Sequence, residues 1–321
     1  MSRHWMGHAE RGRALLIQLI ARITLRLGRP PGRLLLYPIT LYFLIFSGRS
    51  RRASRSFLSR ALNRPAGLRD SFRHYHTFAA TILDRVYFLS GRQDFFKIEI
   101  RGEPILREQL RGKRGCLLLG SHLGSFEVLR SLAGADPDLQ VRPLMYKANA
   151  EKIDSVLRAI NPEIADQVIS IGEPDSLLQV QEAMAQNQAV GILGDRIAID
   201  DKTVSCRFFD RPCRFPAGPM LLAGLLKVPV VLFFGLYNGG RNYQVHFELL
   251  TPRLYANREQ RQQQVAEWTQ RFVERLEYHC RQAPYNWFNF YDFWDESESQ
   301  ADPPTSRNWP LLAAFRNHLV R

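Results

Sequence analysis

The feature that most constrains this chain is a short apolar run that ends in glycine and serine and then presents a histidine. Residues 116–119 are Cys-Leu-Leu-Leu, and they are followed by Gly120, Ser121 and His122, with Glu127 five positions after the histidine. On one continuous helix, side chains five apart point about 140° away from each other and could not cooperate. The pattern therefore predicts a buried strand, a turn that carries His122, and a helix that begins near Glu127.

In that arrangement the two side chains can form a general base. The carboxylate of Glu127 would accept a hydrogen bond from Nδ1 of His122, and Nε2 would then be free to take a proton. No GxSxG elbow supplies a serine nucleophile. The alternative is a histidine with a purely structural hydrogen bond, because a His and a Glu at this spacing also occur together by chance.

The rest of the chain alternates between strand-like and helical patterns. This alternation predicts an α/β fold, an αβα sandwich around a mainly parallel sheet. The expected strands are residues 95–101, 141–146, 167–171, 189–193, 228–236 and 243–250, and the expected helices are residues 70–90, 105–113, 151–159, 174–186, 220–226 and 259–281. Residues 297–321 form a polar, proline-containing linker and a short tail.

Two further segments have side chains or backbone suited to binding. The apolar run 189–193 leads into Asp195 and Arg196, so Arg196 could contact a phosphate or the acyl donor, with Asp195 orienting it. The alternative is an ion pair that closes the strand end. Gly218 and Pro219 suit the start of a helix, whose free N–H groups bind oxyanions. An ordinary loop before a helix explains that second pattern equally well.

Positive charge is concentrated at the N-terminus. The chain carries a net charge of +13, and residues 1–60 contain twelve arginines and one acid, Glu10. The uncharged run 34–48 is shorter than the roughly 20 residues that a spanning helix needs. With the amphipathic stretch 14–27, it predicts an arm (residues 1–60) that lies in an anionic membrane interface. A buried N-terminal hairpin is the alternative. Nucleic acid is not an expected partner, since the arginines alternate with aliphatic runs and no recognised motif is present.

Cysteine and histidine spacing indicates neither a metal nor a disulfide framework. The four cysteines show no CxxC pair, and Cys116 is expected to be a small core residue. His74 and His76 lie close together, but no further ligands are evident, so both are expected at the surface. No phosphate-binding loop or dinucleotide fingerprint occurs, and no cofactor is expected.

Together these segments resemble the late acyltransferases of lipid A assembly, the lauroyl/myristoyl type. That family belongs to the glycerolipid acyltransferases, which are marked by a histidine, four spacers and an acid. The resemblance runs from the basic N-terminal arm to about residue 294. The matching positions occur in the family's order: His122 and Glu127, Asp195, the segment 208–212, Gly218 with Pro219, and Pro229.

The resemblance implies a glycerolipid-acyltransferase-like domain over residues 61–296. It implies an enzyme at the cytoplasmic face of a bacterial inner membrane, with acyl carrier protein as the acyl donor in preference to coenzyme A. The acceptor would be a hydroxyl of a lipid A-type molecule. His122 and Glu127 would be catalytic, and the substrate-binding residues would be Lys147, Asp195, Arg196 and Gly218.

The chain departs from the family at two places. Tyr146-Lys147-Ala148 replaces the family's Tyr-Arg-Pro, which keeps the charge and loses the bidentate guanidinium. The usual basic ending is replaced by the aromatic and acidic segment 283–294, which either lines an acyl tunnel or touches lipid, or is ordinary packing. Three alternatives stay open at this point: a non-lipid-A acceptor such as an aminolipid or an aryl polyene-type lipid, a thioester hydrolase, and a catalytically silent membrane-binding protein.

Overall fold

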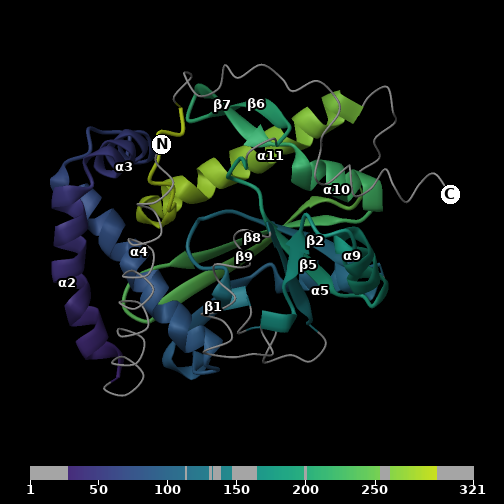
Figure 1. Ribbon diagram of the computed structural model, residues 1–321, viewed down its shortest axis with the longest axis horizontal. Helices are drawn as coiled ribbons and strands as arrows, with labels where there is room; N and C mark the ends of the chain where they lie inside the picture. The colour runs from purple at the N-terminus through teal and green to yellow at the C-terminus, as the bar shows by residue number, and fades with distance from the viewer. Residues whose placement is uncertain are drawn as a thin grey trace, which may run out of the picture.

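A computed structural model of the chain describes residues 28–112, 114–129, 132, 139–146, 165–198, 201–253 and 261–294. Its centre is a seven-stranded sheet with helices on both faces (Figure 1), so the predicted αβα architecture is confirmed. The strands are β1 (Lys97–Arg101), β2 (Cys116–Gly120), β3 (Val141–Tyr146), β4 (Ile169–Ile171), β5 (Ala189–Leu193), β8 (Val230–Tyr237) and β9 (Asn242–Thr251).

The sheet is mainly parallel. The strand order is β1-β9-β8-β2-β5-β3-β4, and the only antiparallel pair among these strands is β8 with β9. The central strands are buried on both faces, which explains why β2, β5 and β8 are almost entirely apolar. In β8, for example, Leu232 and Phe234 enter one core while Val231 and Phe233 enter the other.

Different helices cover the two faces. On one face lie α9 (Ser176–Ala185), α10 (Gly218–Leu226) and the long α11 (Arg261–Gln282). On the other face lie α4 (Leu68–Leu89) and α5 (Glu103–Arg111). Figure 1 shows α11 running across the sheet above β8 and β9.

One pair of strands was not anticipated from the sequence. β6 (Thr203–Phe208) and β7 (Arg211–Pro216) form an antiparallel hairpin over α11, within a segment where no strand was predicted. Its two turn residues, Phe209 and Asp210, both have positive φ, as the favoured two-residue hairpin turn requires. Asparagine and glycine usually mark this turn, and the sequence here has neither.

The described part of the N-terminal arm is helical and is held to α4. α2 (Arg29–Phe46) is followed by α3 (Gly48–Ala61). At the start of α2, Arg29 donates two hydrogen bonds of 2.7 and 2.8 Å to the buried carboxylate of Asp84 on α4. Within the described ranges, no helix combines the length and the apolar character needed to cross a membrane.

Several local expectations can be compared with these elements. The strands predicted at 141–146 and 189–193 have those bounds, and Cys116 is a fully buried core residue. The four cysteines are buried and free. The predicted helices 14–27 and 151–159 and the tail 297–321 lie outside the described residues. The division at residues 60 and 296 stays a prediction.

Candidate active site

The register of the sheet brings together the two segments that contain His122 and Asp195. β2 and β5 are parallel neighbours, and Gly120 at the end of β2 pairs with Leu193 at the end of β5. His122 and Asp195 each lie two residues beyond that pair. Because carboxyl ends of neighbouring parallel strands meet at one edge, both side chains emerge at the same place.

Asp195 holds His122 by two hydrogen bonds. Its Oδ1 lies 2.8 Å from Nδ1 of His122, and its Oδ2 accepts the backbone N–H of His122 at 2.9 Å. The same Oδ2 accepts bonds from Nε1 of Trp287 at 2.9 Å and from Nδ2 of Asn289 at 3.0 Å. Four donors thus satisfy a carboxylate that is fully buried.

This network fixes which nitrogen of the histidine ring faces Asp195. Burial alone would raise the pKa of Asp195, but the charge and hydrogen bonds of His122, with Arg196, outweigh burial and hold the pKa below its usual value. An ionised carboxylate only accepts, so Nδ1 of His122 donates to it, and in the neutral tautomer the lone pair is therefore on Nε2. The His122 side chain is 27% exposed, and Nε2 has no hydrogen-bond partner among the described residues.

The expectation that Glu127 would hold Nδ1 of His122 is wrong, because Asp195 occupies that position. Glu127 instead forms an ion pair with Nε of Arg85 at 2.8 Å, and Oγ of Ser125 lies 3.4 Å from its other oxygen. The predicted helix does begin at residue 127. Arg85 is on α4, so the acid of the His–Glu pattern connects the turn after β2 to that helix.

The turn that carries His122 is tightly fixed. Gly124 has φ +78°, and a Cβ placed there would lie 1.9 Å from the carbonyl oxygen of Gly235 on β8. Ser125 donates its backbone N–H to that same oxygen at 2.8 Å. The turn therefore follows β8 closely, and only glycine fits at position 124.

On its other side the turn is bonded to the C-terminal aromatic segment. The backbone N–H of Gly124 donates to the carbonyl oxygen of Asn286, and the backbone N–H of Phe288 donates to the backbone carbonyl oxygen of His122, both at 2.8 Å. Trp287 is fully buried and packs against Phe57 at a ring distance of 4.8 Å. Of the two expectations for this segment, ordinary packing is the closer one, and the packing also places two donors on Asp195.

The expectation that Asp195 would orient Arg196 is wrong, and the expected contact of Arg196 with a substrate stays a prediction. Its Nε donates to Oδ1 of Asn289 at 2.7 Å, and one terminal nitrogen donates to the carbonyl of Phe288 at 2.8 Å. Two of the three guanidinium nitrogens of Arg196 thus hold the C-terminal segment in place. The residue that Asp195 orients is His122, not Arg196.

The two remaining predicted site residues have different outcomes. Gly218 is the first residue of α10, as expected for a helix start. This start lies beside the end of β5, since a Cβ on Gly194 would be 3.4 Å from Cγ of Pro219. Lys147 lies outside the described residues.

A histidine expected at the surface belongs to the network behind the site. His74 is fully buried, with Nδ1 2.9 Å from Oγ of Ser54 and Nε2 2.8 Å from the carbonyl oxygen of Trp287. Burial lowers the pKa of His74 to about 4, although the bond to Trp287 opposes this. Because α4 packs with this ring inward, α3 and α4 support the residue that contacts Asp195.

Sequence reasoning missed the roles of Asp195, Trp287 and Asn289. The first had a usable signal, since Asp195 and His122 both follow apolar runs that end in glycine. The other two had none, because nothing in the local pattern near residue 287 indicates a partner almost a hundred positions earlier.

Comparison with known proteins assigns the chain to a family. No curated protein sequence matches the chain at a significant level. The sequence profile of the family described as bacterial lipid A biosynthesis acyltransferase matches residues 68–295, well over half of the 321 residues. That range contains His122, Glu127 and Asp195 as well as the whole C-terminal aromatic segment. The chain therefore belongs to the bacterial lipid A biosynthesis acyltransferase family and is an acyltransferase.

Proposed function

We propose that this enzyme is membrane-associated and moves a fatty acyl chain from an acyl carrier protein thioester to a hydroxyl of a lipid A-type acceptor. The observation that carries the chemical part is the pair His122–Asp195. A buried carboxylate with four donors holds Nδ1 of the ring, and the partly exposed ring keeps Nε2 available. This is the arrangement of a general base without an attached nucleophile.

The reaction follows from that arrangement. Nε2 of His122 takes the proton of the acceptor hydroxyl as its oxygen attacks the thioester carbonyl. Asp195 stabilises the imidazolium that forms, as the carboxylate does in a catalytic triad. Collapse of the tetrahedral intermediate expels the thiolate of the donor, and His122 returns the proton to that sulfur. The acyl group passes directly to the acceptor, so no covalent acyl-enzyme forms.

The other sequence-predicted residues have proposed supporting roles. The backbone N–H groups at the start of α10, near Gly218, are suited to stabilise the oxyanion, because a helix N-terminus attracts negative charge. Lys147 is proposed to contact an anionic group of donor or acceptor. Glu127 is proposed to act with Arg85, fixing the turn after β2 and presenting a charged pair near His122.

Membrane attachment is proposed through α2. This helix is anchored by Arg29 and presents its apolar side chains outward, while exposed arginines 49, 52 and 55 follow on α3. An apolar face flanked by arginines suits the interface of an anionic membrane. The exposed apolar side chains are Leu34, Leu35, Tyr37, Leu41, Tyr42, Phe43, Ile45 and Phe46.

Lipid analysis of cells tests the proposed acceptor. Cells lacking the gene should contain a lipid A species lighter by one acyl chain, and so should cells that carry only His122→Ala. The wild-type gene should restore the full species. Unchanged lipid A together with loss of another acylated lipid would replace the acceptor and keep the chemistry.

An assay with purified components tests the donor and separates transfer from hydrolysis. Acyl carrier protein and coenzyme A thioesters of the same chain are offered with and without the lipid acceptor. Thioester loss should require the acceptor and should be faster with the carrier protein. Equal loss without any acceptor would identify a hydrolase, and ping-pong kinetics would contradict direct transfer.

A further inference from the structure

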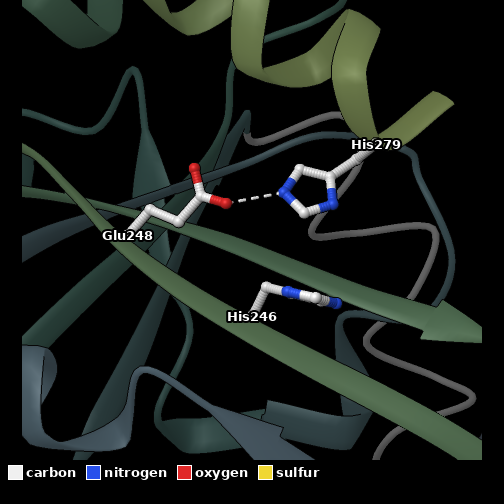
Figure 2. Close-up of side chains that lie close together, drawn as sticks. All are labelled: His246, Glu248 and His279. Atoms are coloured by element: carbon white, nitrogen blue, oxygen red, sulfur yellow. Dashed lines mark hydrogen bonds and ion pairs between the residues drawn. The ribbon is translucent and has the colours of Figure 1, made fainter. Parts of the chain in front are cut away.

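A second group of ligand-type side chains lies between β9 and α11, apart from the proposed active site. His246 and Glu248 are two apart on β9 and therefore project from the same face of the sheet. That face is covered by α11, which contributes His279 (Figure 2). One potential ligand atom from each of the three side chains lies within 4.8 Å of the other two.

In each of the two histidine rings, one nitrogen is hydrogen-bonded to a side-chain oxygen and the other has no partner among the described residues. Nε2 of His279 lies 2.8 Å from Oε1 of Glu248, and Nε2 of His246 lies 3.0 Å from Oε1 of Gln244. Nδ1 of His279 is buried and has no hydrogen-bond partner among the described residues, and no partner of Nδ1 of His246 is found there either. Nε2 of His279 faces Glu248, so it is the nitrogen of this ring that can share an ion with the carboxylate. Nδ1 of His246 is the open nitrogen of the second ring.

The donor atoms of these three side chains are those that Zn²⁺ and similar transition-metal ions prefer. Two imidazole nitrogens and one carboxylate oxygen form a common three-residue zinc set, and water supplies the fourth position. Oxygen-preferring ions such as Mg²⁺ fit two histidines poorly.

We propose that His246, Glu248 and His279 bind one divalent transition-metal ion such as Zn²⁺. Bonds of about 2.0–2.2 Å place neighbouring ligand atoms roughly 3.4 Å apart, so the three side chains would close by roughly 1 Å around the ion. His246 and Glu248 are only partly buried, so they have room to rotate. His279 is 1% exposed and stacks on Phe234 at 4.3 Å, so it is the fixed ligand.

Arg275 limits the affinity of this site. Its guanidinium donates to both oxygens of Glu248 at 2.6 and 2.9 Å, and its positive charge opposes a second cation there. The side chain is 41% exposed and extends over the ring of Tyr278. A bound ion would keep one carboxylate oxygen and leave the other to Arg275, as hydrogen-bonded metal carboxylates do.

The proposed site lies where an ion would stabilise the end of α11 against β9. His279 is in the last turn of α11, which ends at Gln282, and the segment that reaches Asp195 begins at Pro284. An ion that joins β9 to α11 would fix the start of that segment. The site is therefore a clamp behind the catalytic pair and does not take part in the chemistry.

Titration calorimetry with ZnSO₄ on chelator-treated, untagged full-length protein tests the proposal. We expect one equivalent to bind and the melting temperature to rise. His246→Ala should weaken binding by at least about tenfold, the usual cost of losing a metal contact. His246 is chosen because it is partly exposed, whereas replacing buried His279 could disturb folding. Cobalt should give a visible d–d spectrum that His246→Ala removes.

Two further variants make the test specific. Arg275→Gln should tighten zinc binding, because it removes the competing charge, whereas a purely structural ion pair would give only lower stability. His76→Ala removes a histidine on α4 outside the cluster and should bind zinc like the wild type. The proposal is overturned if the wild type binds no zinc up to about 100 µM, or if His246→Ala binds as the wild type does, since loss of a true ligand typically costs 10–100-fold.

Discussion

Two histidine–carboxylate pairs in this molecule have the same 2.8 Å contact and opposite patterns of burial. In the pair His122–Asp195 the ring is 27% exposed and the carboxylate is fully buried. In the pair His279–Glu248 the ring is 1% exposed and the carboxylate is 24% exposed. A general base must reach its substrate, so only the first pair can exchange a proton with a bound acceptor.

The groups that donate hydrogen bonds to the two carboxylates also differ. Asp195 is held by an indole, an amide and a backbone N–H, which fix it without neutralising it. Glu248 is held by the guanidinium of Arg275, which neutralises it at the surface of the sheet. The first environment preserves a negative charge for the imidazolium that forms during catalysis, and the second ties a strand to a helix.

The largest expected effect is the loss of the exposed ring. His122→Ala should lower turnover by at least about 10²-fold and by up to about 10⁴-fold, because the general base is removed. Melting should change little, since the ring is partly exposed. Acyl transfer from purified acyl carrier protein thioester measures this, with His76→Ala as the control. Turnover close to that of the wild type would contradict the assignment of the first pair.

Asp195→Asn should have the next largest effect, about 10²-fold or more on kcat. The amide keeps an oxygen for Trp287 and Asn289, but it removes the charge and no longer fixes the Nδ1–H tautomer. The measurement is kcat and KM as a function of pH, alongside thermal melting. A variant with unchanged kcat and a lowered melting temperature would make Asp195 a structural residue only.

A third carboxylate sharpens the comparison, because Glu127 is close in sequence to His122 yet pairs with Arg85. Glu127→Ala should lower turnover by about 10²-fold. If Glu127 acts through Arg85, then Arg85→Gln should produce a similar loss and the double variant should add little to either. Independent, multiplying losses in the double variant would show that the two residues act separately.

The turn beneath the first pair should limit stability as well as activity. Gly124→Ala places a Cβ at positive φ and against the carbonyl oxygen of Gly235, so unfolding should become easier by at least about 2 kcal/mol. Urea unfolding of Gly124→Ala and wild type checks this. Gly239→Ala has a similar positive φ but open space around the glycine, so its cost should be smaller. Equal costs would mean that contact with Gly235 is unimportant.

The smallest expected effect is the pH dependence of the stability that the second pair, His279–Glu248, contributes. Burial would raise the pKa of Glu248, but the bonds to His279 and Arg275 outweigh it and lower the pKa to about 2. A folded-state pKa below the unfolded value stabilises the protein above the unfolded pKa, and that stabilisation is lost as pH falls toward 2. Because the carboxylate is 24% exposed and is paired with the more exposed Arg275, roughly 1 kcal/mol is expected after screening.

A matched variant isolates that contribution. In the presence of a chelator, the difference in unfolding free energy between wild type and Glu248→Gln should shrink between pH 6 and about pH 3, because the pKa falls from 4.5 to about 2 on folding and much of the stabilisation is lost by pH 3. A difference that stays constant over this range would show that Glu248 titrates normally in the folded protein.

Strand ends were more predictable from the sequence than strand partners. The apolar run before His122 and the run before Asp195 were both identified, because buried parallel strands are continuous in apolar character. Their pairing was not, because register between β2 and β5 depends on residues more than seventy positions apart. Proximity in sequence favoured Glu127 as the partner of His122, and non-local pairing gave that position to Asp195.

The same reason explains the other omissions. The β6–β7 hairpin has a turn of Phe209 and Asp210, whose positive φ no local signal indicates. His74 was expected at the surface because no further metal ligands were evident, but α3 and the segment around Trp287 cover it. Each of these features depends on tertiary packing, which overrides local pattern.

The position of Trp287 and Asn289 in the chain also sets an order of assembly. Both follow every strand of the main sheet in sequence, yet they complete the shell around Asp195. During synthesis, β2 and β5 can pair long before these two donors leave the ribosome. Until then Asp195 has two of its four bonds missing, and a carboxylate without these donors is costly to bury. The shell that fixes the base is therefore complete only after residue 289 has been synthesised and has packed against β2 and β5.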